Sequence, residues 1–205
     1  AAFLFGLGPT FAKLSYNLGA NPALAIILRY ALAVLVIIIP LILIKVNIQK
    51  IKKNIFALLI ISFGSICLTT GLLSSVIFIP VSFVALIFYT YPLVVLSYTF
   101  FSKKKINQFQ IVGFIFTFVG LGLALGPSFE NLNIIGILLA FLASIGAAII
   151  LITNEHLSKS FHVITINAFT NIISFIVFSL IILIKFNITL PTESVGWYFV
   201  ILASV

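Results

Sequence analysis

Long runs of apolar residues recur along the chain and decide what it can fold into. Several of them approach or exceed 18 residues with one charge or none, the length that a helix needs to cross a hydrocarbon core of about 30 Å. Backbone groups in lipid must bond within their own segment, and these runs lack the two-residue alternation of a β-barrel. With 63% hydrophobic and 7% charged residues, the chain has more apolar surface than a soluble domain of this length can bury. We therefore expect an all-α membrane protein with several spans.

Seven spans and the start of an eighth are predicted. The chain contains no methionine, and both of its ends fall within apolar stretches, so we expect it to be a piece of a longer protein. Its single cysteine, Cys67, excludes an intrachain disulfide, and we expect no metal site and no cofactor. The predicted spans are a first one that ends at Leu18, then Pro22–Ile44, Asn54–Ser74, Pro80–Phe101, Asn107–Leu125, Leu132–Ile152 and Val163–Ile184, and a last one from Val195.

The charges of the loops predict the orientation. Eight lysines fall in the loops on one side of the predicted spans, whereas the opposite loops hold Lys185, Glu130 and Glu193. Positive loops mark the cytoplasmic side. We therefore expect the N-terminus to be cytoplasmic and the protein to be a multi-pass protein of the cell (cytoplasmic or inner) membrane. The eight are Lys45, Lys50, Lys52, Lys53, Lys103, Lys104, Lys105 and Lys159.

Two cations lie inside the first helical hairpin. Lys13 and Arg29 flank the turn Gly19-Ala20-Asn21-Pro22, which places both about 11–13 Å inside the same membrane face at 1.5 Å per residue. Ionisable residues within spans are costly and mark functional pathways by default. We expect a substrate site for a carboxylate or phosphate here, with Asn17 and Tyr30 beside the cations. Two alternatives stay open: both side chains reach toward the headgroups, or Arg29 is tied to helix-end carbonyls as a clamp.

Other candidate binding residues lie in the fourth and seventh spans. Phe88, Tyr89 and Tyr91 surround Pro92 near the middle of the fourth span and form a candidate aromatic wall. In the seventh span Asn167, Thr170, Asn171 and Ser174 share one helix face. We include Asn167 and Asn171 in the substrate site. The alternatives are packing for the aromatic residues and interhelical hydrogen bonding for the polar face.

Hinges and proton transfer are predicted at four residues. Pro9 and Pro92 interrupt the backbone hydrogen bonding of their spans and are candidate hinges, with a static kink as the alternative. Glu155 and His156 end the sixth span on the cytoplasmic side. They are the candidates for proton coupling, and a solvated helix end beside Lys159 is the alternative.

An internal repeat and small residues indicate how the spans pack. Shifting the chain by 138 residues places Ala2-Phe3-Leu4 on Ala140-Phe141-Leu142 and Gly8 on Gly146. This predicts two five-span repeats of opposite orientation, as in many secondary transporters. Small residues at four-residue spacing predict close helix contacts in the sixth span, and glycines predict them in the fifth. These residues are Gly136, Ala140, Ser144 and Ala148, and Gly113, Gly120, Gly122 and Gly126.

The order and spacing of several motifs resemble the drug/metabolite transporter superfamily, specifically its EamA-like family. The resemblance covers nearly the whole chain and implies ten helices in two inverted repeats, here truncated after about seven spans. Residues 1–126 would form the first repeat, with its start missing, and residues 131–205 part of the second. It also implies transport of small metabolites, often amino acids, usually outward and without ATP. The motifs are Gly6, Lys13, Asn21-Pro22, Arg29-Tyr30, Ala85, Tyr91-Pro92-Leu93, Gln110-Ile111-Val112-Gly113 and Gly120-Leu121.

These observations favour a secondary exporter and no enzyme. Paired carboxylates, a phosphate loop and a Ser/His/Asp set are not seen in the sequence. The alternatives are an uptake or exchange carrier for organic anions or sugar conjugates, and a non-transporting structural membrane subunit. The expected partners are a small-molecule substrate and the lipid bilayer, with a homodimer as an open alternative and no nucleic acid.

Overall fold

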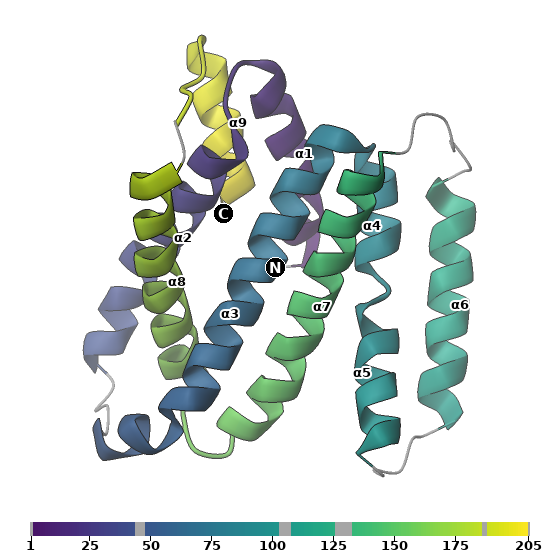
Figure 1. Cartoon of the computed structure of the whole chain (residues 1–205), viewed down its shortest axis with the longest axis vertical. Coiled ribbons are helices and arrows are strands. Elements are labelled where there is room, and N and C mark those ends of the chain that lie inside the picture. Colours follow the sequence, from purple (N-terminus) through teal and green to yellow (C-terminus); the bar gives the residue numbers. More distant parts are fainter. Residues whose placement is uncertain (1, 44–47, 103–107, 126–132, 186–187, 205) are drawn as a thin grey trace.

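Helices form the regular structure of the described part of the chain. The computed structural model describes residues 2–43, 48–102, 108–125, 133–185 and 188–204, and Figure 1 shows how the helices of these ranges are arranged. The helices are α1 (Ala2–Asn17), α2 (Pro22–Leu43), α3 (Ile48–Phe78), α4 (Val81–Phe88), α5 (Tyr91–Phe101), α6 (Gln108–Leu125), α7 (Ile134–Leu157), α8 (Val163–Lys185) and α9 (Ser194–Ser204).

Five helical segments are long and apolar enough to cross a membrane. They confirm the prediction of a multi-span helical membrane protein. Two shorter apolar helices, Ile111–Gly120 and Ser194–Ser204, accompany them. The five segments are Pro22–Ile42, Ile55–Phe78, Val81–Phe101, Ile134–Leu157 and Val163–Ile184.

The turn between α1 and α2 follows from its residues. Gly19 adopts φ 94°, a backbone conformation that side chains with a Cβ rarely take. The Asn21 side chain accepts a hydrogen bond from the backbone N–H of Leu24 (3.0 Å), and Pro22 is the first residue of α2. A capping amide followed by proline at the first helical position is a typical helix start.

The third and sixth predicted spans are longer in the structure. Asn54, the predicted start of the third, has non-helical φ/ψ (−111°, 15°) inside α3 and separates a lysine-rich first segment from the apolar span. The helix then continues past Ser74 to Phe78 and stops just before Pro80. The sixth span was expected to end at Ile152, but α7 continues to Leu157. The helix α7 contains no proline, and its glycines do not interrupt it before Leu157. Glu155 and His156 therefore lie within its last turn.

The fourth predicted span is one apolar segment that breaks into α4 and α5. Pro92 is the second residue of α5 and has no N–H to donate to the carbonyl group one turn earlier. The Thr90 hydroxyl donates to the carbonyl oxygen of Ile87 (2.6 Å) and lies 3.0 Å from Ser144 Oγ of α7. The break at Pro92 is thus present, while hinge motion there stays a prediction. Pro9, in contrast, lies inside the continuous helix α1.

The closest helix contact joins α3 and α7 in the middle of the molecule (Figure 1). A Cβ on Gly71 of α3 would lie 2.4 Å from the carbonyl oxygen of Leu139, and one on Gly146 of α7 would lie 2.6 Å from that of Gly64. Only glycine allows the two backbones to approach this far. The predicted small-residue face of the sixth span is confirmed, because its members are all buried in α7: Gly136, Ala140, Ser144 and Ala148.

The predicted contacts of the fifth-span glycines are not made in the described part of the chain. There, nothing lies within 4 Å of a Cβ built on Gly113, Gly120 or Gly122 of α6, so this prediction is wrong for these three residues. Gly126 lies outside the described residues. The reason is that α6 is the outermost helix (Figure 1) and contacts the rest of the chain mainly through α4.

The remaining helices pair around α3 and α7. Contacts join α2 to α8 and to α9, α1 to α9, and α3 to α8. The main buried cluster lies between α1, α2, α3, α4 and α7, reaches α8 and α9, and includes Ile26, Tyr30, Val76 and Val84. Of the candidate site residues, Tyr30 and Phe88 belong to this cluster and Tyr91 packs against it.

Candidate functional site

The Lys13 side chain caps the C-terminal end of α3. Its ammonium group donates to the carbonyl oxygens of Val76 (2.5 Å) and Ile77 (3.4 Å). One helical turn further on, the Tyr16 hydroxyl donates to the carbonyl oxygen of Leu73 (3.1 Å). The last carbonyl groups of a helix have no intrahelical partner, and the C-terminal dipole favours a cation. Lys13 thus makes a clamp to helix-end carbonyl groups of the kind that was considered for Arg29.

Tyr30 is buried in a group of hydroxyl-bearing residues between α2, α3 and α8. Its side chain is 1% exposed, and its hydroxyl donates to the Ser65 carbonyl oxygen (3.0 Å) and lies 3.4 Å from Ser65 Oγ. Nearby, Ser174 Oγ of α8 donates to the Ser62 carbonyl oxygen of α3 (3.3 Å). These bonds connect three helices through hydroxyl groups, which is the interhelical bonding considered for the polar face of the seventh span.

Arg29 is half-buried on α2, directly before Tyr30. Successive side chains of a helix project about 100° apart, so Arg29 does not follow Tyr30 into the contact with Ser65. Binding of an anionic substrate group by Arg29 stays a prediction, whereas Lys13 and Tyr30 hold helices together in this structure.

The asparagine candidates lie at more accessible positions. Asn17 is exposed at the end of α1 and Asn167 is exposed on α8. The Asn171 side chain donates to the Asn167 carbonyl oxygen within the same helix (2.8 Å). The predicted polar face is thus divided: Thr170 and Ser174 are buried, and Asn167 remains accessible to a ligand.

The aromatic candidates form one cluster at the break between α4 and α5. The Phe88 ring centroid lies 5.6 Å from that of Tyr89 and 5.5 Å from that of Tyr91, and the two tyrosine rings are 6.4 Å apart. Phe88 is buried, whereas Tyr89 is 38% exposed. The cluster was expected from the sequence. Its contact with a substrate is a prediction that rests mainly on the accessible Tyr89.

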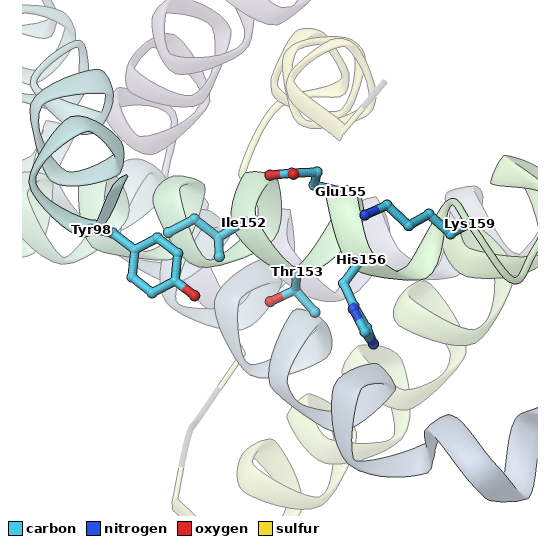
Figure 2. Close-up of a pocket in the computed structure, with 6 residues that line it drawn as sticks. All are labelled: Tyr98, Ile152, Thr153, Glu155, His156 and Lys159. Carbon is cyan, nitrogen blue, oxygen red and sulfur yellow. The ribbon is translucent and has the colours of Figure 1, made fainter. Parts of the chain in front are cut away.

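Glu155 and His156 line a pocket at the C-terminal end of α7. The pocket has a volume of about 270 Å³ and is also lined by Ile152, Thr153, Lys159 and Tyr98 of α5. Figure 2 shows that Glu155 and Lys159 extend from one side of the helix and Thr153 and His156 from another. Proton coupling by Glu155 and His156 stays a prediction. Among the residues that the structure describes, no group of three His, Cys, Asp or Glu side chains could hold a metal ion.

Comparison with protein families connects these features to a class of protein. The model of the EamA-like transporter family matches residues 1–126. The chain belongs to the EamA-like transporter family. Comparison with curated proteins and with solved structures gives no match.

The EamA-like match spans α1 to α6 and therefore contains most of the candidate site. Lys13, Arg29 and the aromatic cluster at Pro92 lie inside it, whereas the α8 asparagines and the pocket on α7 lie outside it. The EamA-like family consists of membrane transporters of small solutes, and the five apolar segments agree with a multi-pass protein of this kind.

Tyr98 and Thr153 are pocket residues that the sequence did not reveal. The positions of Ile152, His156 and Lys159 follow the i, i+4, i+7 spacing of one helix face, and the sequence shows that spacing. Tyr98 comes from α5, and its approach to α7 depends on the break at Pro92 and on tertiary packing.

Proposed function

We propose that the protein is a secondary transporter of small metabolites that works without ATP and exports amino acids or similar compounds by alternating access. The proposal assigns residues 1–126 to one repeat and residues 131–205 to an inverted second one. The observation that carries it is the pairing of the helices across these two parts.

Most helix contacts between the two parts have a counterpart under the 138-residue shift; those of α4 and α5 with α7 have none among the described residues. The shift places α1 on α7, α2 on α8 and α3 on α9. Accordingly, α1 packs against α9 as α7 packs against α3, and α2 packs against α9 as α8 packs against α3. Because the shift relates α2 to α8, the contact between these two helices is its own counterpart. A pseudo-two-fold axis between inverted repeats produces this pattern.

The correspondence extends to single residues. A Cβ on Gly8 of α1 would have the carbonyl oxygen of Ala203 in α9 as its nearest contact, at 3.7 Å. Its counterpart Gly146 (8 + 138) faces Gly64 of α3, one residue from the position (203 − 138 = 65) that corresponds to Ala203. The Gly146 contact is tight and the Gly8 contact is looser.

The proposed path for the solute follows the candidate residues. Arg29 would bind an anionic group, since a guanidinium offers two parallel hydrogen bonds to a carboxylate. Tyr89, at the break between α4 and α5, would supply an aromatic wall elsewhere along the path. The lysine-rich loops support a cytoplasmic N-terminus in the cell membrane. The proposed binding residues are Asn17, Arg29, Phe88, Tyr89, Tyr91, Asn167 and Asn171, with hinges at Pro9 and Pro92 and proton coupling at Glu155 and His156. Lys13 and Tyr30, which the sequence also offers for the site, are instead proposed to support it by holding helices together.

Transport assays in liposomes test this proposal. The full-length protein is reconstituted, and movement of radiolabelled amino acids, organic anions and neutral solutes is measured for the wild type and for Arg29→Ala. We expect amino acids to move and Arg29→Ala to lose carboxylated solutes more strongly than neutral ones.

The same assay distinguishes the alternatives. Arg29→Lys keeps the charge without the two-pronged geometry and is the matched control. Preferred movement of organic anions or sugar conjugates would favour an uptake or exchange carrier. If no solute moves under any gradient while the protein remains folded, the transport proposal is wrong.

A further inference from the structure

The pocket at the end of α7 lies where a membrane surface would be. The apolar segment Ile134–Leu157 ends beside it, so that Glu155, His156 and Lys159 occupy the boundary between hydrocarbon and water. On α5, Tyr98 belongs to the last turns of the segment Val81–Phe101. Two spans therefore end together at this pocket.

The pocket combines opposite charges with hydroxyl groups. Glu155 lies in the last turn of α7 and Lys159 four residues further on, in the turn after the helix, and both line the pocket together with the hydroxyl-bearing Thr153 and Tyr98 (Figure 2). The two charges cancel. A purely anionic ligand would meet the carboxylate, and a purely cationic one would meet the ammonium group. The lining is complementary to a ligand that carries both charges a few bonds apart.

Exposed apolar residues continue from the pocket along the lipid-facing side of α5. Phe100 is 68% and Phe101 is 81% exposed, and Tyr98 itself is 47% exposed. In a bilayer these rings contact acyl chains or sit at the headgroup level. A ligand held between this surface and the charged end of α7 would therefore have an apolar part as well as two charges.

We propose that this pocket binds the headgroup of a phospholipid with a primary amine, such as phosphatidylethanolamine. The phosphate would accept hydrogen bonds from Lys159 and from the Thr153 and Tyr98 hydroxyls, and the headgroup ammonium would donate to Glu155. A phosphoethanolamine group has about eight non-hydrogen atoms, which suits about 270 Å³ when a water molecule takes about 30 Å³. A quaternary choline has no N–H to donate to Glu155, so phosphatidylcholine should bind less well.

Native mass spectrometry of the full-length protein tests the proposal. The protein is equilibrated with equimolar phosphatidylethanolamine, phosphatidylcholine and phosphatidylglycerol of identical acyl chains, and the retained lipids are counted. We expect the wild type to prefer phosphatidylethanolamine over phosphatidylcholine roughly fivefold, the effect of one partly exposed charged hydrogen bond. Glu155→Gln should make these two lipids equal, and Lys159→Gln should reduce the retention of both.

Matched variants keep the test decisive. Lys52→Gln and Glu193→Gln change exposed charges that do not line the pocket and should leave the preference unchanged. The exchange of Glu155→Lys with Lys159→Glu keeps both charges and should retain the preference if the protein's thermal midpoint is intact. The proposal is wrong if Glu155→Gln or the folded exchange behaves otherwise. It is equally wrong if soluble phosphoethanolamine occupies the pocket as well as the lipid does, because the pocket would then take a free solute.

Discussion

The ammonium group of Lys13 in α1 donates to the carbonyl oxygen of Val76 at the end of α3, at 2.5 Å. The residues are 63 positions apart, and the bond fixes the first span to the C-terminal end of the third. A cation that the sequence offers as a substrate ligand thus holds two helices together. Tyr16 makes a second bond to the same helix end.

Replacement of Lys13 should lower stability. We expect Lys13→Met to reduce the free energy of unfolding by about 1 kcal/mol, because the Val76 and Ile77 carbonyl groups lose a charged donor. Lys13→Arg keeps a donor and should be milder. Thermal unfolding in detergent measures both. Unchanged midpoints in Lys13→Met, together with lost transport, would return Lys13 to a role in substrate binding.

A methyl group on Gly71 should separate α3 from α7. The Cβ of Gly71→Ala would lie 2.4 Å from a backbone oxygen of α7, so the helices must move apart, and we expect a loss of about 1–3 kcal/mol. Gly113→Ala is the matched control, because its Cβ meets open space in the described part of the chain. Thermal midpoints of the two variants in the same detergent check the difference. Equal midpoints would contradict the close packing.

Tyr30→Phe should affect stability more than transport. The change removes the hydroxyl that donates to Ser65, at a cost of about 1 kcal/mol, and leaves Arg29 in place. We expect a lower thermal midpoint and a transport rate that is nearly unchanged in folded protein. A large loss of transport at an unchanged midpoint would show that Tyr30 contacts the solute instead.

Pro92→Ala should join α4 and α5 into one helix. Alanine restores the backbone N–H and is favoured over proline in a helix interior by about 3 kcal/mol. If the break is needed for movement, the initial rate of solute transport falls while the thermal midpoint is kept or rises. Pro9→Ala, inside the uninterrupted α1, is the comparison. A Pro92→Ala rate equal to that of the wild type would assign the break a static role.

The sequence predicts the features that depend on neighbouring residues. The turn at Gly19 and Asn21 and the small-residue face of α7 follow from local geometry and spacing, and the structure has both of them. The partner of Lys13 does not follow, because it is a carbonyl group of a distant helix end and every residue has one. The position of Tyr98 in the pocket could not be predicted for the same reason, because its contact with α7 depends on tertiary packing.

The glycines of α6 show the reverse case, in which the sequence pattern predicts a helix contact that the described residues do not make. Their spacing is that of a packing face, yet spacing alone does not say whether a second helix is present, and in the described residues none lies against Gly113, Gly120 and Gly122. Gly136 and Ala140 share a comparable pattern and are buried against α3. A pattern of small residues predicts that another helix can approach closely. It does not predict that a second helix lies there.

One uninterrupted helix, α7, carries two of these contacts and ends at the pocket. Gly146 fixes it to α3, Ser144 lies against Thr90 at the interrupted fourth span, and Glu155 lies in its last turn. A tilt of α7 would therefore shift the surroundings of the aromatic cluster and of the pocket at the membrane surface at the same time. By linkage, whatever binds at its end and whatever binds beside Thr90 would change each other's affinity by the same factor. The composition of the surrounding bilayer would then set the apparent affinity of the carrier for its solute.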